Sequence, residues 1–394
     1  MTKQKIKILT NIRFAQTAGI AQVVFAFMKF IAVGKSKNIE IVAVNIINSK
    51  KETYRKVTKQ NTSTISVGIK VPKIAKVIDK AKTLSYVEKK YEKIIQSYQK
   101  AIQKEKPNVV LINGTYFMPW CLLVASEREG IPAVLHYHGV LAKETQTWKK
   151  HQRKIFLEME RRFDKENIFY IFPSEITKNI VENEVFCHKV KRYSVLPNPV
   201  LDHFFANPIG YSDKIETKNI GIVSRWTRVK NVHFCEKLAK YNHKKGGKFS
   251  INIITDLDTK KRNYKNLAKI VKFHKPTKNN KKLASFYRNM GVVISPSHFE
   301  TYGNVAKEAL ASGTPAIVNS NMGVSETFNK LGLADWIIDF KSVKLVYNKI
   351  ENIIGGKVSN EVRKEIKDNY KPCKIFNEIV SILGNAVLPL EIKN

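Results

Sequence analysis

Apolar residues along the chain follow two patterns: short continuous runs, and longer stretches in which they recur at helical spacing. The stretches between runs have apolar residues three or four positions apart, as on one face of a helix. Alternating strands and helices predict an α/β protein whose parallel sheets are covered on both faces. The short runs, typical of buried parallel strands, occupy residues 6–10, 39–47, 109–113, 132–138, 168–172, 220–225, 250–254 and 291–295.

The predicted helices differ in how much of their surface is apolar. Residues 70–106 read as one long basic helix with a single apolar stripe, which favours packing against a domain and leaves a lysine-rich face exposed. The other predicted helices are residues 17–29, 232–241, 304–312 and a last amphipathic segment after Lys371-Pro372.

The chain of 394 residues is longer than one ordinary core requires, so two domains are predicted. The first is expected over residues 1–205 and the second over 206–371, with a polar linker at 207–218. Residues 372–394 supply the C-terminal helix.

Two glutamates, Glu300 and Glu308, lie on either side of a predicted helix start. A strand comes before them, and the helix reaches a natural stop at Gly313. Backbone N–H groups around Gly303 and Asn304 would point out of this helix start and favour an anion such as a diphosphate.

The spacing of the two acids suits a long, polyhydroxylated ligand. Two acids placed eight positions apart on one helix would lie about 12 Å apart along its axis, similar to the length of an extended nucleotide sugar. The alternative is a solvated acid on a surface helix and a second one near a cap.

A histidine pair, His136 and His138, falls on one side of the predicted strand 132–138, because side chains alternate along a strand. Ligands of open α/β sheets bind beyond the carboxyl ends of the strands, and this strand ends at Gly139. A histidine there can hydrogen-bond a sugar hydroxyl. An imidazole bonded to nearby backbone remains the alternative, above all for His136.

Two further polar clusters follow strands of the second domain. Arg225 ends the strand 220–225, and Lys230 follows just before a helix, with Arg228 as a rival cation and a solvated turn as the alternative. Asp256 and Asp258, after the strand 250–254, superficially match a D-x-D metal motif and are interpreted as a turn.

The segment SPSHFETYGNVAKEALASGTPAIVNSNMGVSE, residues 295–326, resembles the E-x7-E signature of the retaining family-4 glycosyltransferases. Glu300 and Glu308 match its two acids. The resemblance implies the GT-B fold: two Rossmann-like, doubly wound domains facing across a cleft, with the C-terminal helix packing back on the first domain. It also implies transfer of a sugar from a nucleotide donor, such as a UDP- or GDP-sugar, with retention at the anomeric carbon and without a metal ion or other cofactor.

The same resemblance assigns roles to individual residues. Glu300 and His138 would act on the donor sugar, Glu308 would hold the ribose, and Arg225 with Lys230 would neutralise the diphosphate. Ala18 stands where the family usually has the first of two glycines, so that only Gly19 carries over. The donor-binding set that it implies is Gly19, Arg225, Lys230, His274, Thr301, Tyr302, Gly303, Asn304, Val305 and Glu308.

A net charge of +36 indicates an anionic partner unless it reflects coding composition alone. The basic helix, with Lys149, Lys150, Arg153 and Lys154, favours peripheral contact with an anionic membrane surface. Nucleic acid is not expected as a partner, because no binding signature for it accompanies the charge. The acceptor that we expect is a lipid-linked or cell-envelope glycan; a protein acceptor and the oligomeric state stay open.

The location expected from the sequence is the cytoplasm, with peripheral contact at the inner membrane face. No apolar run is long enough to span a bilayer, and the start of the chain does not resemble a signal peptide. Widely spaced cysteines without a C-x-x-C argue against zinc and fit a reducing compartment. Two other functions remain: a nucleotide-sugar 2-epimerase on the same fold, and a non-catalytic protein that binds glycans or nucleic acid.

Overall fold

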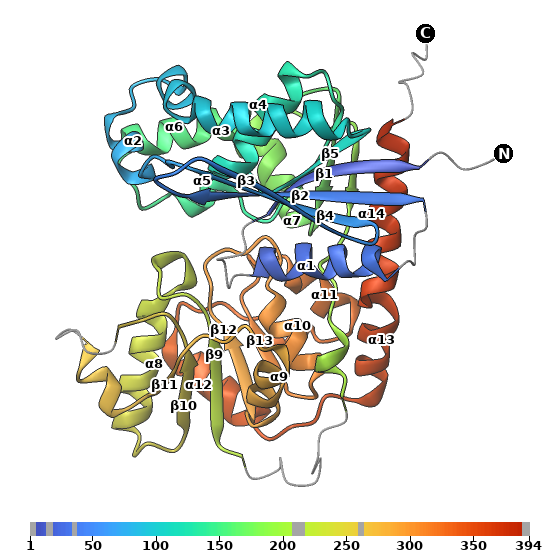
Figure 1. The fold of residues 1–394 in the computed structure, drawn as a ribbon. Helices are drawn as coiled ribbons and strands as arrows, with labels where there is room; N and C mark the ends of the chain where they lie inside the picture. The colour runs from blue at the N-terminus through green and yellow to red at the C-terminus, as the bar shows by residue number, and fades with distance from the viewer. Residues whose placement is uncertain (1–4, 13–18, 34–37, 207–216, 259–263, 388–394) are drawn as a thin grey trace. The chain divides into compact units, whose positions relative to one another are not determined.

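The computed structural model describes residues 5–12, 19–33, 38–206, 217–258 and 264–387 (Figure 1). By its internal contacts the chain divides into two compact units. The first unit comprises Met1–Pro197 together with Pro372–Asn394, and the second comprises Asn198–Lys371. The chain therefore passes into the second unit after Pro197, whereas the sequence placed this boundary after residue 205. Most of the predicted linker, residues 207–216, lies outside the described residues.

The first unit contains an eight-stranded sheet in the order β3-β4-β2-β1-β5-β6-β7-β8. All neighbouring pairs are parallel except β3 and β4. From β4 to β7 the order reproduces the Rossmann arrangement, which reverses direction between β1 and β5. Its strands are β1 (Ile6–Ile12), β2 (Ile39–Asn48), β3 (Thr53–Lys59), β4 (Thr62–Ile69), β5 (Val109–Asn113), β6 (Ala133–His136), β7 (Ile168–Phe172) and β8 (Tyr193–Val195).

Helices cover both faces of this sheet. Phe27 and Phe30 of α1 pack with Phe376 of α14 against one face, so the last helix of the chain belongs to the core of the first unit. The helices α3 and α4 lie on the other face (Figure 1). The helices of this unit are α1 (Gly19–Ala32), α2 (Ile74–Lys80), α3 (Leu84–Glu105), α4 (Phe117–Arg128), α5 (Leu141–Glu144), α6 (Lys150–Arg161), α7 (Glu175–Ile180) and α14 (Pro372–Val387).

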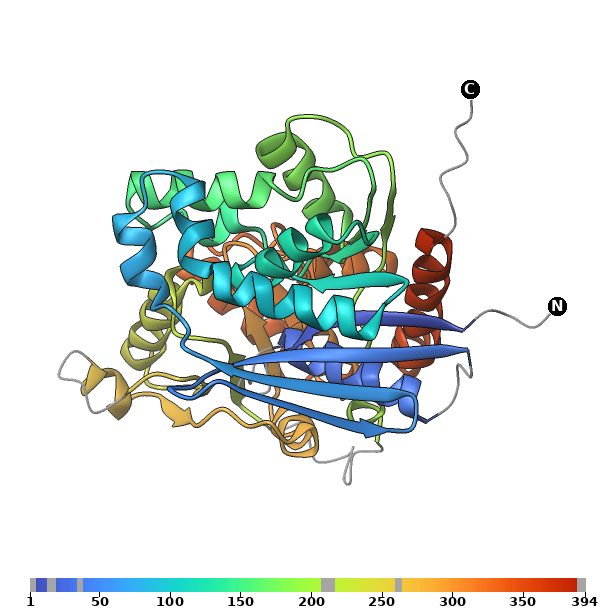
Figure 2. The same cartoon turned by 45° about the horizontal axis from the view of Figure 1, so that its top comes forward.

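The hairpin formed by β3 and β4 is absent from the sequence prediction. It extends the sheet beyond β2 as long blue strands (Figure 2). Every residue of β3 is exposed, so this strand lacks the apolar alternation that marks a half-buried strand. In β4 the signal exists, because Ile65, Val67 and Ile69 alternate with polar residues and are buried.

The single basic helix predicted over residues 70–106 is wrong: the structure has two helices there, α2 and α3. Ala81 adopts an extended conformation (φ −73°, ψ 122°) that ends the first helix. Thr83 caps the second, since its hydroxyl accepts a hydrogen bond from the backbone N–H of Tyr86. The apolar stripe of α3 is buried as expected.

The second unit contains a five-stranded parallel sheet in the order β11-β10-β9-β12-β13, again a Rossmann arrangement. The helices α8 and α12 pack on one face and α9, α10, α11 and α13 on the other. The strands are β9 (Asn219–Val223), β10 (Ser250–Ile254), β11 (Lys272–His274), β12 (Val292–Ser295) and β13 (Ala316–Val318). The helices are α8 (Val232–Lys244), α9 (Asn280–Arg288), α10 (Asn304–Ala311), α11 (Val324–Lys330), α12 (Val343–Ile353) and α13 (Asn360–Tyr370).

Two doubly wound α/β units confirm the predicted fold class. Within the described residues, no helix has both the length and the apolar character that a membrane span needs.

Candidate active site

The candidate site of the second unit lies where its strand order reverses, between β9 and β12. Ligands of open α/β sheets bind outside the carboxyl ends of the strands at this switch point. Arg225 lies two residues after the end of β9, which stops at Val223 and not at 225 as predicted, and the short 3₁₀ helix Arg228–Lys230 comes next. Glu300 follows β12. The topology thus brings the predicted cations and the first predicted acid to one edge of the sheet.

Lys230 and Glu300 form an ion pair in this unit. The Lys230 Nζ lies 3.1 Å from Glu300 Oε1, and the two side chains are 17% and 18% exposed. Ser297 Oγ donates to the same carboxylate oxygen at 2.7 Å. The backbone N–H of Gly323 donates to the Glu300 carbonyl at 3.1 Å, which holds this residue against the loop after β13. The residue predicted to bind the diphosphate and the residue predicted to bind the donor sugar therefore contact each other directly.

The start of α10 is a candidate anion site. Gly303 precedes the helix with φ +106°, a backbone conformation that disfavours other residues. A Cβ there would also lie 2.6 Å from the Met322 Cε. No side chain caps the helix, although the first N–H groups of an α-helix lack intrahelical partners. These amides and the positive end of the helix dipole favour a phosphate group.

Glu308 lies inside α10, half-buried, and accepts a hydrogen bond at 3.0 Å from the hydroxyl of Tyr287. Burial raises the pKa of the Glu308 carboxyl to about 7, and the Tyr287 hydrogen bond and the charge of Lys307 oppose this rise. The hydroxyl of Tyr287 orients the carboxyl through Oε2, which leaves the other oxygen as an acceptor for a ligand hydroxyl.

The raised pKa of Glu308 predicts a pH effect on stability. The folded protein holds this proton between pH 4.5 and about 7, whereas the unfolded chain does not, so stability falls as pH rises through this window. Glu308→Gln should lessen the fall in the free energy of unfolding between pH 5 and pH 8 by about 2 kcal/mol, as measured by urea denaturation. Burial also raises the pKa of Glu160 to about 7. This residue is present in both proteins, so its contribution to the fall is the same in both. Equal falls in the two proteins would contradict the assignment.

The predicted donor residue Tyr302 is buried, together with Lys307, which the sequence analysis did not select. The Tyr302 side chain is 2% exposed, and its hydroxyl lies 2.8 Å from Thr327 Oγ1. A donor could therefore contact Tyr302 only through its backbone. The fully buried Lys307 ammonium donates to the Asn198 carbonyl and to the Tyr302 hydroxyl, and lies over the rings of Tyr302 and Tyr370 at 4.2 and 4.1 Å. Burial lowers the pKa of Lys307 well below its usual value.

The remaining predicted residues of the second unit are spread around this edge. Arg225 is exposed, and Thr301 and Val305 are half-buried. The Asn304 side chain is not free to cap, since its Oδ1 accepts from Asn198 Nδ2 at 3.1 Å. The exposed His274 ends β11, and its Nε2 lies 3.1 Å from Asn252 Oδ1.

Asp256 makes structural contacts in the second unit. Its Oδ1 accepts from the Trp226 backbone N–H at 3.0 Å, a contact between the segments that follow β10 and β9. No cluster of three or more histidine, cysteine or acidic side chains in the described ranges is placed to hold a metal ion.

In the first unit the histidine pair lies at the end of β6. His136 is the last strand residue and His138 follows two positions later, with the ring centroids 4.1 Å apart. Burial lowers the pKa of His136 to about 4. Burial, together with His136, lowers the pKa of His138 well below its usual value. The helix α1 begins at Gly19, and the loop before it, including Ala18, lies outside the described residues.

The loop after His138 is held by an acid that the sequence analysis did not select. Glu160 of α6 is fully buried and accepts the backbone N–H groups of Leu141 and Ala142 at 2.9 and 3.0 Å. Thr115 Oγ1 donates to the Gly139 carbonyl at 3.3 Å. Glu160 lies on α6 among apolar residues at helical spacing. Its position on the buried face of this helix was the sequence signal that could have identified it.

Comparison with known proteins identifies the two parts of the sequence. Residues 212–371 match the family of glycosyl transferases group 1, and residues 87–202 match glycosyltransferase family 4. A capsular polysaccharide biosynthesis glycosyltransferase of Staphylococcus aureus is 31% identical over 103 residues, which cover 25% of this chain and 27% of the relative. An uncharacterized glycosyltransferase of Methanocaldococcus jannaschii is 26% identical over 110 residues, covering 27% and 28%. Each match thus spans little more than a quarter of the relative.

Solved structures resemble the whole chain. A sucrose-phosphate synthase from Thermosynechococcus elongatus aligns with a TM-score of 0.75 at 14% identity, over 97% of this chain and 99% of that one. A structure described as trehalose-6-phosphate from E. coli bound with UDP-2-fluoro glucose has a TM-score of 0.68 at 13% identity, over 96% and 98%. At such identities the likeness shows the fold, which is GT-B. Both family matches thus stand in order along one chain of GT-B fold, the family 4 match in the first unit and the group 1 match mainly in the second.

Proposed function

We propose that this protein is a glycosyltransferase that moves a sugar from a nucleoside diphosphate donor to a cell-envelope glycan, with retention at the anomeric carbon. The observation that carries the proposal is the Lys230–Glu300 ion pair, which lies at the same switch point as the uncapped start of α10. A cation, an acid and free amide groups are the three elements that a phosphorylated sugar requires.

The donor would bind by exchanging partners with the ion pair. Lys230 would turn from the Glu300 carboxylate to the diphosphate, which Arg225 and the amides at Gly303 and Asn304 also neutralise. Glu300 would then accept hydrogen bonds from the hydroxyls of the sugar. Glu308 would accept those of the ribose, since Tyr287 already orients its carboxyl.

In the reaction the bond between the anomeric carbon and the diphosphate oxygen breaks, and the acceptor oxygen bonds to the same face of the sugar. The acceptor hydroxyl gives its proton to the departing phosphate oxygen. The leaving group gains negative charge as the bond breaks, so Lys230 and Arg225 stabilise the transition state more than the bound donor. For His138 we propose a hydrogen bond to a hydroxyl of the reacting sugar. No metal ion is required, because the cations take its role.

The relatives narrow the substrates that we propose. The Staphylococcus aureus relative acts in capsular polysaccharide biosynthesis by its name, which supports a surface polysaccharide or its lipid-linked precursor as the acceptor. The structure from E. coli is described with UDP-2-fluoro glucose, which supports a UDP-sugar as the first donor to test.

We further propose that the first unit contacts an anionic membrane surface. Lys150, Arg153 and Lys154 of α6 are exposed, and α6 packs beside α2 and α3, which carry further exposed lysines. Trp148, just before α6, is 37% exposed, and tryptophan favours the membrane–water interface. Contact of this kind predicts sedimentation with phosphatidylglycerol vesicles that is lost at high salt; retention in the supernatant at low salt would contradict it.

The donor site is tested by thermal shift with a panel of nucleotide sugars, followed by the best donor with Arg225→Ala and Glu308→Ala. Wild type should gain stability that rises with the logarithm of donor concentration over Kd, and each variant should lose most of that gain. Lys237→Ala is the control for Arg225→Ala, because it removes an exposed cation of the same unit from α8. Unchanged donor binding by both site variants would overturn the assignment.

Retention is tested on the product, whose anomeric configuration is read by NMR. Release of a free, epimerised sugar from the donor, in the absence of an acceptor, would instead identify a 2-epimerase. Inversion at the anomeric carbon would contradict the proposed mechanism.

A further inference from the structure

The chain passes between the two units at two places, which we call the links. The second unit begins at Asn198 and ends at Lys371, so the first link lies just before Asn198 and the second just after Lys371. Prolines on both sides of Asn198 remove two backbone N–H donors from the first link. The N–H of Val200 donates to the carbonyl of Tyr370 at 2.8 Å, which ties the two links together inside the second unit.

Helix α10 holds the first link at two points. The side-chain Nδ2 of Asn198 donates to Oδ1 of Asn304, the first residue of the helix, at 3.1 Å. Lys307 follows Asn304 by three positions and so lies on the same face of the helix, and its Nζ donates to the Asn198 carbonyl. The Oδ1 of Asn198 is buried and has no hydrogen-bond partner in the part of the chain that the structure describes. A buried acceptor without a donor is costly, so the first link depends on its two contacts with α10.

The same lysine holds the second link. Its Nζ lies 4.1 Å from the centre of the Tyr370 ring, one position before the end of the second unit. The Nζ also donates to the hydroxyl of Tyr302 at 2.8 Å. An ammonium group has three hydrogens, so the contacts with Asn198, Tyr302 and the Tyr370 ring can all form together. Lys307 is fully buried, which keeps solvent from competing for these contacts.

The start of α10 is also the candidate site for the diphosphate, together with Lys230. The first N–H groups of a helix gain partners when a phosphate binds, and α10 is short, with few internal hydrogen bonds. Helix formation is cooperative, so a ligand on the first turn stabilises the next turn, which carries Lys307. Ligand binding and the contacts of the two links therefore depend on one short helix.

We propose that Lys307 couples the links to the donor site: a nucleoside diphosphate bound at the start of α10 suppresses local opening of both links through the contacts of Lys307 with Asn198 and Tyr370. The inference rests on the proposed donor site. It adds that the links are held in place while the nucleotide is bound and open more often after it has left, which is a coupling between two distinct parts of the unit.

The test is hydrogen–deuterium exchange of the full chain, measured by mass spectrometry with and without saturating UDP. In wild type, UDP should slow exchange in α10 and slow that of the Val200 amide at least about fivefold, the lower end of the usual coupling between sites. Lys307→Met fills a similar volume without N–H groups. In this variant UDP should still protect α10 but should slow exchange of the Val200 amide less than about twofold. Lys364→Met, which replaces an exposed lysine of α13, is the matched control and should respond as wild type does.

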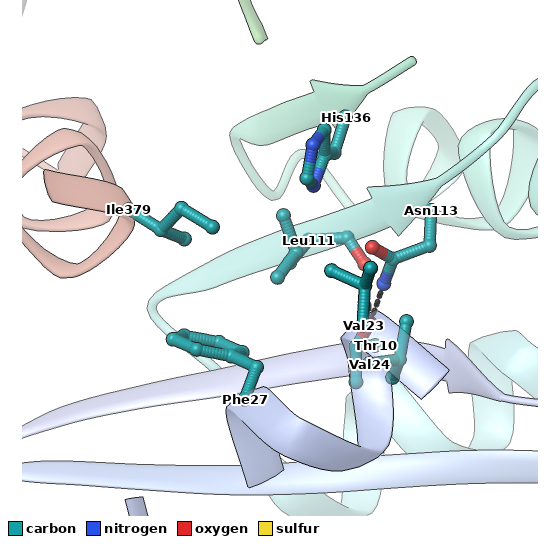
Figure 3. A pocket seen from close by; sticks show the side chains of 8 residues that line it. All are labelled: Thr10, Val23, Val24, Phe27, Leu111, Asn113, His136 and Ile379. Carbon is teal, nitrogen blue, oxygen red and sulfur yellow. Dashed lines mark hydrogen bonds between the residues drawn. The ribbon is translucent and has the colours of Figure 1, made fainter. Parts of the chain in front are cut away.

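The core of the first unit serves as the reference segment. Leu111 of β5 and His136 of β6 line a cavity of about 10 Å³, which has room for one water molecule and none for a nucleotide (Figure 3). UDP should therefore leave exchange of the β5 amides unchanged. Equal slowing in β5 and at Val200 would mean that UDP acts on the whole chain, and it would overturn the inference.

A second variant covers the case in which Lys307→Met does not fold. Asn198→Ala removes the contact with Asn304 and should weaken the effect of UDP at Val200. A full wild-type response in Lys307→Met, or in Asn198→Ala if only that variant folds, would overturn the inference alone, as would protection confined to α10 in wild type. If neither UDP nor GDP changed exchange or melting temperature in wild type, the proposed donor site would fall as well.

Discussion

Replacing Lys230 with alanine is expected to lower kcat/KM for sugar transfer about a hundredfold or more. The Nζ of Lys230 lies 3.1 Å from Glu300, so a ligand that displaces this contact can place its diphosphate against the ammonium group. Loss of that cation removes stabilisation of the leaving group, whose charge grows in the transition state. Initial rates with the best donor, at subsaturating concentration, measure the effect.

Lys237→Ala is the matched control, since it removes an exposed lysine from α8 of the same unit. Its rate should stay near that of wild type. The double variant Lys230→Ala/Glu300→Gln adds a second check: two residues that act on one bound donor should have effects that do not simply multiply. If Lys230→Ala had the rate of wild type, the Lys230–Glu300 ion pair would not be part of the donor site.

Replacing Lys307 with alanine is expected to lower the free energy of unfolding by about 3 kcal/mol, the largest stability effect that we expect. The change leaves the Asn198 carbonyl without its donor, removes the contacts with the Tyr302 and Tyr370 rings, and opens a cavity at a fully buried position. Urea denaturation monitored by circular dichroism measures the loss.

Lys307→Met separates packing from charge. Methionine fills a similar volume without an ammonium group. Lys307→Met should therefore lower the free energy of unfolding by less than half as much as Lys307→Ala, because apolar replacements of buried charges are often tolerated. Equal losses in both variants would mean that the hydrogen bond to Asn198 dominates. No loss in the alanine variant would contradict the burial of this side chain.

The sequence was sufficient for the apolar, buried strands of both sheets and for the order strand, loop, helix at the site of the second unit. The runs that became β1, β5, β7, β9, β10 and β12 are short, apolar and buried, and such runs have few other interpretations. Helix α10 was equally clear, because its apolar spacing begins after a glycine and ends before Gly313. The strand order could not be obtained in this way, since it depends on pairing between distant segments.

The errors come from residues whose partners lie far away in the sequence. Strand β3 is polar and exposed throughout, and its place depends on β4 alone. The sequence analysis did not select Lys307, because lysine usually lies at the surface; its place one turn before Leu310 and Ala311, both buried, was the available signal. Asn198 shows no pattern in the sequence, because its role depends on two side chains of α10.

The position of α14 has a consequence for how the protein is synthesised. Ile375, Phe376 and Ile379 of this last helix fill one side of a core whose other members come from the beginning of the chain. The ribosome makes the whole second unit before it makes these residues. The amino-terminal sheet must therefore persist with one apolar face only partly covered, by α1, until these residues have been made, and during that interval it is a natural client for chaperones.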